Sequence, residues 1–187
     1  GRYDGFSGTE GSAVMKSESV RDTVAMMCAN HFDVLVMRHP RDGTLQWAAD
    51  CSAVPVVNGG DGKNEHPTQA MLDVLTLYVL NQGKLDGLRV GFGCDLSHGR
   101  TVRSLSLALA HFEGVTIRWA AEDFLGMPED LAVLLAERGV RVERDPSVRD
   151  VMRQVDFYYM TRPQLERMHG VTQRDILSMM EQYRIDL

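Results

Sequence analysis

Side chains that can bind anions follow several apolar runs of this chain. Arginines follow three stretches with strand character: Arg38 follows residues 32–37, Arg100 follows residues 88–93 after a short loop, and Arg162 follows residues 156–160. A guanidinium group can form two parallel hydrogen bonds to one carboxylate or phosphate. A single arginine at a strand end is more often structural or solvated. Three together indicate an anion site, because ligands of open α/β sheets bind beyond the carboxyl ends of the strands.

The segment DGKNEHPTQ at residues 61–69 contributes two further candidates. Pro67 suits the first position of a helix, where its missing N–H would have no partner in any case. His66 then stands at or just before the helix N-terminus, and Gln69 lies about one turn in. Both could contact a ligand, and the helix dipole would favour an anionic one. The alternative is that both side chains only cap the helix.

Apolar runs of strand length alternate with segments of helical spacing along the whole chain. Strands are predicted at residues 32–37, 54–57, 88–93, 115–121, 140–143 and 156–160, and helices at 19–28, 45–51, 67–80, 101–112, 128–138, 147–155 and 173–183. The alternation predicts an α/β fold with two doubly wound parallel sheets. We place one domain at residues 1–82 and the other at 83–187, bridged by the helix at 67–82. The nearly continuous apolar strand at 32–37 should be buried on both faces.

Composition and charge exclude several classes of protein. The 187 residues are 44% hydrophobic and 25% charged, with a formal charge of -6, which argues against a general nucleic-acid or anionic-membrane surface. No apolar run approaches the roughly 18 residues that span a bilayer. Cys28, Cys51 and Cys94 are few and widely spaced, which indicates free thiols, a cytoplasmic location and no metal site. No cofactor is expected, because GFGCDLSHG has Leu96 where a dinucleotide-binding loop needs its third glycine.

Four motifs occur in one order along the chain: VMRHP at 36–40, NGGDGKNEHPTQ at 58–69, GCDLSHGRTVRS at 93–104 and YYMTRPQLER at 158–167. Together they resemble the aspartate carbamoyltransferase family, whose members carbamoylate aspartate in pyrimidine synthesis. The resemblance covers nearly the whole chain. It implies a carbamoyl-phosphate-binding domain at residues 1–82 and an aspartate-binding domain at 83–187, with carbamoyl phosphate and L-aspartate as ligands.

The resemblance also implies a role for the candidates in the first half of the chain. Arg38 would contact the phosphate and the carbonyl group of carbamoyl phosphate, His66 the same carbonyl oxygen, and Gln69 the carbamoyl nitrogen. Negative charge builds on that oxygen when an amine attacks, and donors fixed in advance stabilise it. We expect His66 to donate a hydrogen bond and not to act as the base, since the departing phosphate could take the proton.

Three residues of the second half would bind aspartate by the same resemblance. Arg100 would hold one carboxylate, and Arg162 with Gln164 the other. Two arginines would select a dicarboxylic amine over ornithine, because the wrong substrate would leave a buried guanidinium unpaired. In the early loop, Ser12 and Lys16 match residues that reach the phosphate of a neighbouring subunit, which implies a homotrimer with shared sites.

Two segments typical of the family do not occur in this sequence. They are a Ser-Thr-Arg-Thr phosphate loop upstream and a His-Pro-Leu-Pro-Arg segment downstream. We therefore expect the sequence to be part of a longer enzyme. The alternatives are a homologue whose site is completed by a partner, a non-catalytic relative, or a carbamoyltransferase for another amine, against which Arg100, Arg162 and Gln164 argue. Regulatory or pathway partner chains are left open.

Overall fold

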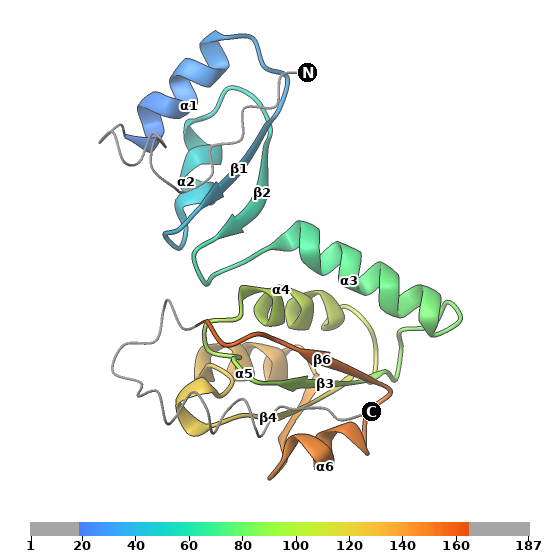
Figure 1. The fold of residues 1–187 in the computed structure, drawn as a ribbon. Helices are drawn as coiled ribbons and strands as arrows, with labels where there is room; N and C mark the ends of the chain where they lie inside the picture. Colours follow the sequence, from blue (N-terminus) through green and yellow to red (C-terminus); the bar gives the residue numbers. More distant parts are fainter. Residues whose placement is uncertain (1–18, 165–187) are drawn as a thin grey trace. The chain divides into compact units, whose positions relative to one another are not determined.

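The computed structural model describes residues 19–164, in which helices alternate with parallel strands (Figure 1). The α/β fold predicted from the sequence is confirmed. The predictions at residues 173–183, Ser12 and Lys16 lie outside the described residues. Contacts divide the chain into two compact units, Gly1–Thr68 and Gln69–Leu187, and each is described by itself.

The first unit has two helices and two strands, α1 (Val20–Ala29), β1 (Leu35–His39), α2 (Thr44–Cys51) and β2 (Val56–Asp61). The hydroxyl oxygen of Ser19 caps α1 by accepting a hydrogen bond from the backbone N–H of Asp22 at 3.1 Å. The two strands pair in parallel. Val24 of α1, Leu35 of β1 and Ala48 of α2 form the buried centre, so both helices pack on one face of the strand pair.

The prediction that residues 32–37 form a strand buried on both faces is wrong for the described part of the chain. Pairing begins only at Leu35, and Val36 is 72% exposed. Successive side chains of a strand point to opposite faces. Leu35 and Met37 therefore point into the cluster with the two helices, whereas Val36 points away from it.

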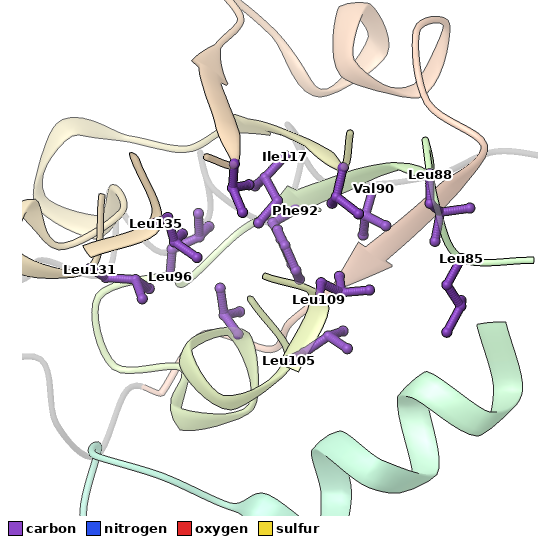
Figure 2. Close-up of a cluster of buried hydrophobic side chains, with 13 residues drawn as sticks. Leu85, Leu88, Val90, Phe92, Leu96, Leu105, Leu109, Ile117, Leu131 and Leu135 are labelled. Atoms are coloured by element: carbon purple, nitrogen blue, oxygen red, sulfur yellow. The ribbon is translucent and has the colours of Figure 1, made fainter. Parts of the chain in front are cut away.

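The second unit is built on a four-stranded parallel sheet in the order β5-β4-β3-β6. Its elements are α3 (Pro67–Leu80, beginning two residues before the unit), β3 (Arg89–Gly93), α4 (Arg100–Leu109), β4 (Thr116–Ala120), α5 (Glu129–Glu137), β5 (Arg141–Arg144), α6 (Val148–Met152) and β6 (Phe157–Met160). Phe92 and Ile117 pack against Leu105 of α4 and Leu135 of α5 in the main core (Figure 2). Helix α6 lies on the other side of the sheet from α4 (Figure 1), as a doubly wound sheet requires.

Helix α3 is grouped with the second unit from Gln69 onward. Ala70 is buried, and Val74 and Leu77 pack against the core of that unit. The first domain predicted from the sequence ends at residue 82, 14 residues beyond this division at Thr68. The apolar contacts of α3 with the second unit explain why the division falls at the start of this helix and not after it. The domain boundary at residue 82 stays a prediction.

The strand order places a topological switch point beside β3. From β3 the chain proceeds outward through β4 to β5, then returns to form β6 on the other side of β3. In open α/β sheets ligands bind where the order reverses, outside the carboxyl ends of the strands. Those ends are Gly93 and Met160, which are paired in the sheet.

Glycines at two positions of β3 make room for Tyr158. A Cβ atom at Gly93 would lie 2.9 Å from Cζ of Tyr158 and closer still to its hydroxyl oxygen, and one at Gly91 would lie 3.0 Å from Cδ2 of the same ring. This packing accounts for the glycines of the segment that superficially resembles a dinucleotide-binding loop.

Gly93→Ala is therefore expected to lower the free energy of unfolding by about 1–3 kcal/mol, the usual cost of overpacking a core. Urea unfolding of Gly93→Ala, Tyr158→Phe and the double variant would measure this loss and its coupling. Because Phe lacks the hydroxyl oxygen that a Cβ would meet, the double variant should lose less than the two single variants together. Strictly additive losses would contradict the packing argument.

A partly buried ion pair links β4 to the segment after β5. The guanidinium of Arg118 donates to both carboxylate oxygens of Asp145, at 2.9 and 2.8 Å, and also contacts Glu143. The amide of Gln154 donates to the same Asp145 carboxylate at 3.0 Å. The hydrogen bonds from Arg118 hold the pKa of Asp145 below its usual value, and they outweigh burial, which acts in the opposite direction.

Because this pKa is lowered by folding, the stability that the Asp145 carboxylate contributes is complete above its unfolded-state pKa of about 3.9. It is lost as the pH falls through the lower folded-state pKa. Urea unfolding between neutral and strongly acidic pH should therefore show a shallower acid loss for Asp145→Asn than for the wild type. Asp50→Asn, an exposed position on α2, serves as the control. Equal slopes for Asp145→Asn and the wild type would contradict this role.

Candidate active site

The carboxyl ends of β1 and β2 lie side by side in the first unit, and the end of β1 carries the predicted site residue Arg38. His39 is the register partner of Asp61, and Arg38 precedes it at the end of β1. Arg38 is exposed, whereas His39 is buried and its Nδ1 atom accepts a hydrogen bond from the backbone N–H of Arg41 at 3.1 Å. The strand therefore ends with one side chain facing the interior and one facing solvent.

The segment after β2 leads directly to His66. Pro67 is the first residue of α3, as predicted, and His66 is half-buried just before it. Its Nδ1 atom lies 3.2 Å from the hydroxyl oxygen of Thr68, and the amide of Gln69 donates to the Asp73 carboxylate at 2.9 Å. Both contacts are local, so they fix the two side chains at the start of α3 and are compatible with either a capping role or a ligand-binding role.

In the second unit, Thr161 joins the carboxyl ends of β3 and β6. Its hydroxyl accepts a hydrogen bond from the backbone N–H of Asp95 at 2.8 Å and lies 3.0 Å from the carbonyl oxygen of Gly93, to which it can donate. The backbone N–H of Thr161 also donates to the Gly93 carbonyl at 3.2 Å. The loops that follow the two strands are thereby held together at the switch point.

Asp95 is the centre of this loop pair. It is fully buried, and its Oδ1 accepts a hydrogen bond from the backbone N–H of His98 at 3.0 Å and lies 3.0 Å from the ring nitrogen Nδ1 of His98. Its Oδ2 accepts from the backbone N–H of Gln164 at 3.0 Å, and the Gln164 amide donates to the His98 carbonyl at 2.6 Å. One buried carboxylate thus connects the loop before α4 with the loop after β6.

These contacts bring together the segments that carry Arg100, Arg162 and Gln164. Arg100 is half-buried at the first position of α4, two residues after His98. Arg162 is exposed, and one of its guanidinium nitrogens donates to the Pro163 carbonyl at 3.2 Å. Arg38 and His66 belong to the first unit, and the roles predicted for all these side chains stay predictions.

Cys94 lies in the same loop but is unsuited to nucleophilic chemistry. Burial first, and then the nearby Asp95 carboxylate, raise the pKa of its thiol to about 11, so it is protonated at neutral pH. Its backbone adopts φ of 79°, a left-handed conformation that a non-glycine residue rarely takes. Such strain persists where surrounding contacts enforce it, as the hydrogen bonds of Asp95 and Thr161 do here. All three cysteines are free thiols.

Within residues 19–164 the structure contains neither a cluster of metal ligands nor a membrane-spanning helix. No group of three or more His, Cys, Asp or Glu side chains in this range is placed to hold a metal ion. Within the same range, no helix has the length and apolar character needed to cross a membrane.

Sequence reasoning did not identify Asp61, Asp95 or Thr161. Each stands at or just after the end of a strand: Asp61 at the end of β2, Asp95 after β3, and Thr161 after β6. A polar residue with a short side chain at this position was the available signal, since it can accept hydrogen bonds from the backbone of neighbouring loops.

Known proteins are similar to this chain in sequence and in fold. Residues 4–79 match the family model for the aspartate/ornithine carbamoyltransferase carbamoyl-P binding domain. The catalytic subunit of M. jannaschii aspartate transcarbamoylase is 35% identical with a TM-score of 0.80, over 94% of this chain and 56% of that one. The chain belongs to the aspartate/ornithine carbamoyltransferase family. The resemblance seen in the four sequence motifs is confirmed.

Two structures of the Trypanosoma cruzi aspartate transcarbamoylase are also similar. The complex with N-(phosphonacetyl)-L-aspartic acid is 34% identical, covers 96% of this chain and 57% of that one, and has a TM-score of 0.83. The complex with carbamoyl phosphate and aspartate is 35% identical, covers 92% and 55%, and has a TM-score of 0.79. The chain therefore spans between 55% and 57% of the length of these three relatives.

Proposed function

We propose that this protein transfers the carbamoyl group of carbamoyl phosphate to the amine of L-aspartate, giving N-carbamoyl-L-aspartate and phosphate for pyrimidine synthesis. The observation that carries the proposal is that hydrogen bonds at the switch point join the loop before Arg100 to the loop that carries Arg162 and Gln164, which supports a site with two arginines for a dicarboxylate. The similar T. cruzi enzyme is described in complex with carbamoyl phosphate and aspartate, which supports the choice of substrates.

Carbamoyl phosphate would be bound by Arg38, His66 and Gln69. The exposed guanidinium of Arg38 would hold a phosphate oxygen and the carbonyl oxygen, and His66 would donate a second hydrogen bond to that carbonyl. Gln69 would contact the carbamoyl nitrogen. The amine nitrogen of aspartate attacks the carbonyl carbon, the bond from that carbon to the phosphate oxygen breaks, and the phosphate leaves with the amine proton. Donors at the carbonyl oxygen stabilise the charge that develops there.

Aspartate would be bound by Arg100 at one carboxylate and by Arg162 with Gln164 at the other. Arg100 begins α4, where the helix dipole adds to the attraction of its own charge for a carboxylate. Ornithine has only one carboxylate and an additional amine, so it would leave one arginine unpaired. The arrangement therefore favours a dicarboxylic acceptor.

The proposal extends to assembly and location. Ser12 and Lys16 would reach the phosphate bound by a neighbouring subunit of a homotrimer, and the enzyme would act in the cytoplasm. Sedimentation of the purified protein would measure the assembly. A monomer with full activity would contradict shared sites.

The decisive experiment is an assay of the full polypeptide with carbamoyl phosphate and either L-aspartate or L-ornithine. We expect one phosphate to be released for each N-carbamoyl-L-aspartate formed, and N-(phosphonacetyl)-L-aspartic acid to inhibit. A preference for ornithine would instead indicate a carbamoyltransferase for another amine. Absence of both transfer and inhibitor binding would refute the catalytic proposal and favour a non-catalytic relative.

A further inference from the structure

Asp61, at the end of β2, accepts four hydrogen bonds within the first unit. It is 1% exposed. Its Oδ1 accepts from the amide of Asn58 at 3.2 Å and from the backbone N–H of Glu65 at 3.1 Å, and its Oδ2 accepts from the backbone N–H of Gly43 at 2.7 Å and the amide of Asn64 at 3.1 Å. Two donors thus point at each oxygen of a single buried carboxylate.

The Asp61 carboxylate remains charged in these surroundings. Burial by itself would raise its pKa, but the hydrogen bonds from Asn64, Asn58, Gly43 and Glu65 together hold the pKa below its usual value. Four donors and no acceptor match a carboxylate, which only accepts hydrogen bonds when ionised. An amide cannot replace it, because its NH₂ group would face two donors whichever way it was turned.

The hydrogen bonds of Asp61 connect the loop that follows Arg38 to the loop that precedes His66. Gly43 caps the N-terminus of α2 and ends the loop that follows Arg38, whereas Glu65 immediately precedes His66. Further backbone contacts run beside the carboxylate, because the N–H of Gly62 donates to the His39 carbonyl at 2.8 Å and the N–H of Lys63 to the Asp42 carboxylate at 2.8 Å. The segments carrying Arg38 and His66 are therefore fixed to each other by Asp61 together with these two neighbouring contacts.

We propose that Asp61 is a positioning residue, which holds the loops of Arg38 and His66 in the geometry that binds carbamoyl phosphate. The inference rests on the function proposed above and deepens it, since neither the sequence motifs nor the comparisons assign a role to Asp61. It acts through other residues: its own oxygens are buried and occupied by donors from the protein. Misplacement of catalytic donors by about 1 Å can reduce a rate about 100-fold.

The test is the steady-state kinetics of the full-length Asp61→Asn protein, with each substrate varied in turn. We expect kcat/KM for carbamoyl phosphate to fall about 100-fold, through a higher KM together with a lower kcat. The KM for aspartate should remain unchanged. This split between the two substrates is a readout that a general loss of stability would not produce.

Two control variants separate positioning from stability. Asp50→Asn makes the same chemical change at an exposed position of α2, and Val24→Ala destabilises the fully buried centre of the first unit without touching either loop. Both should retain the wild-type kcat/KM at a temperature where circular dichroism shows them folded. Wild-type kinetics for folded Asp61→Asn, or an equal fall in Val24→Ala, would overturn the inference.

A second measurement keeps this inference separable from the proposed function. If the wild-type protein showed no carbamoyl transfer, the proposed function would fail. The role of Asp61 would then be decided by calorimetry, which measures the binding of inorganic phosphate to the wild type and to the variant. Phosphate binding by the wild type that is lost in folded Asp61→Asn supports a positioning role. Equal binding by the two proteins, or none by the wild type, overturns it.

Discussion

Arg38→Ala is expected to lower kcat/KM for carbamoyl transfer by about 100- to 1,000-fold, which corresponds to the loss of one preorganised donor at a developing oxyanion. In the proposed reaction Arg38 supplies two contacts, one to the phosphate and one to the carbonyl oxygen. Its side chain is exposed at the end of β1, so its removal leaves no cavity in the core. The effect should therefore fall on the reaction and hardly at all on the free energy of unfolding.

The measurement is kcat/KM with carbamoyl phosphate varied, together with urea unfolding of the same preparation. Arg21→Ala is the matched control, because it removes the same charge from an exposed position on α1 of the same unit. Full activity in Arg38→Ala would contradict the assignment. A loss of activity that follows a loss of stability would show that Arg38 is structural.

The fold was predictable because its signals are local. Apolar runs of strand length alternate with helical spacing, and Pro67 marks the start of α3, as expected from its missing N–H. The error at residues 32–37 arose because an apolar run does not reveal whether both of its faces are covered. Val36 continues the run in the sequence yet is 72% exposed in the structure.

The candidate site was predictable only in part. Arg38, Arg100 and Arg162 could be found because each arginine stands at the end of a strand or in the segment that follows one, which sequence alone can indicate. The acids that fix their loops also stand at or just after strand ends, but the sequence does not show which groups they bind. Asp95 accepts from the backbone N–H of Gln164, which is 69 residues away, and Asp61 from that of Gly43, which is 18 residues away. Backbone donors are common to nearly all residue types, so such pairings leave no sequence pattern.

Asp95→Ala is the second change from which we expect a large effect. It removes the acceptor for the backbone N–H groups of His98 and Gln164 in a fully buried position, so both donors would be left unsatisfied. A lost hydrogen bond to a charged group costs about 1.5–3 kcal/mol, so the free energy of unfolding should fall by about 3 kcal/mol or more. Urea unfolding would measure this loss. Asp130 is exposed on α5 and pairs with Arg103 of α4, so Asp130→Ala should lower the free energy of unfolding much less.

The kinetic effect of Asp95→Ala should be the reverse of that expected for Asp61→Asn. Asp95 holds the loops of Arg100 and Gln164, so its loss should raise the KM for aspartate and leave the KM for carbamoyl phosphate unchanged. Asp61 holds the loops of Arg38 and His66, so the opposite substrate should be affected. A simple loss of stability would lower the amount of folded enzyme, and with it the apparent kcat, without changing the KM of one substrate selectively. Opposite selectivity in the two folded variants would therefore assign one buried carboxylate to each substrate, and equal effects on both substrates would contradict that assignment.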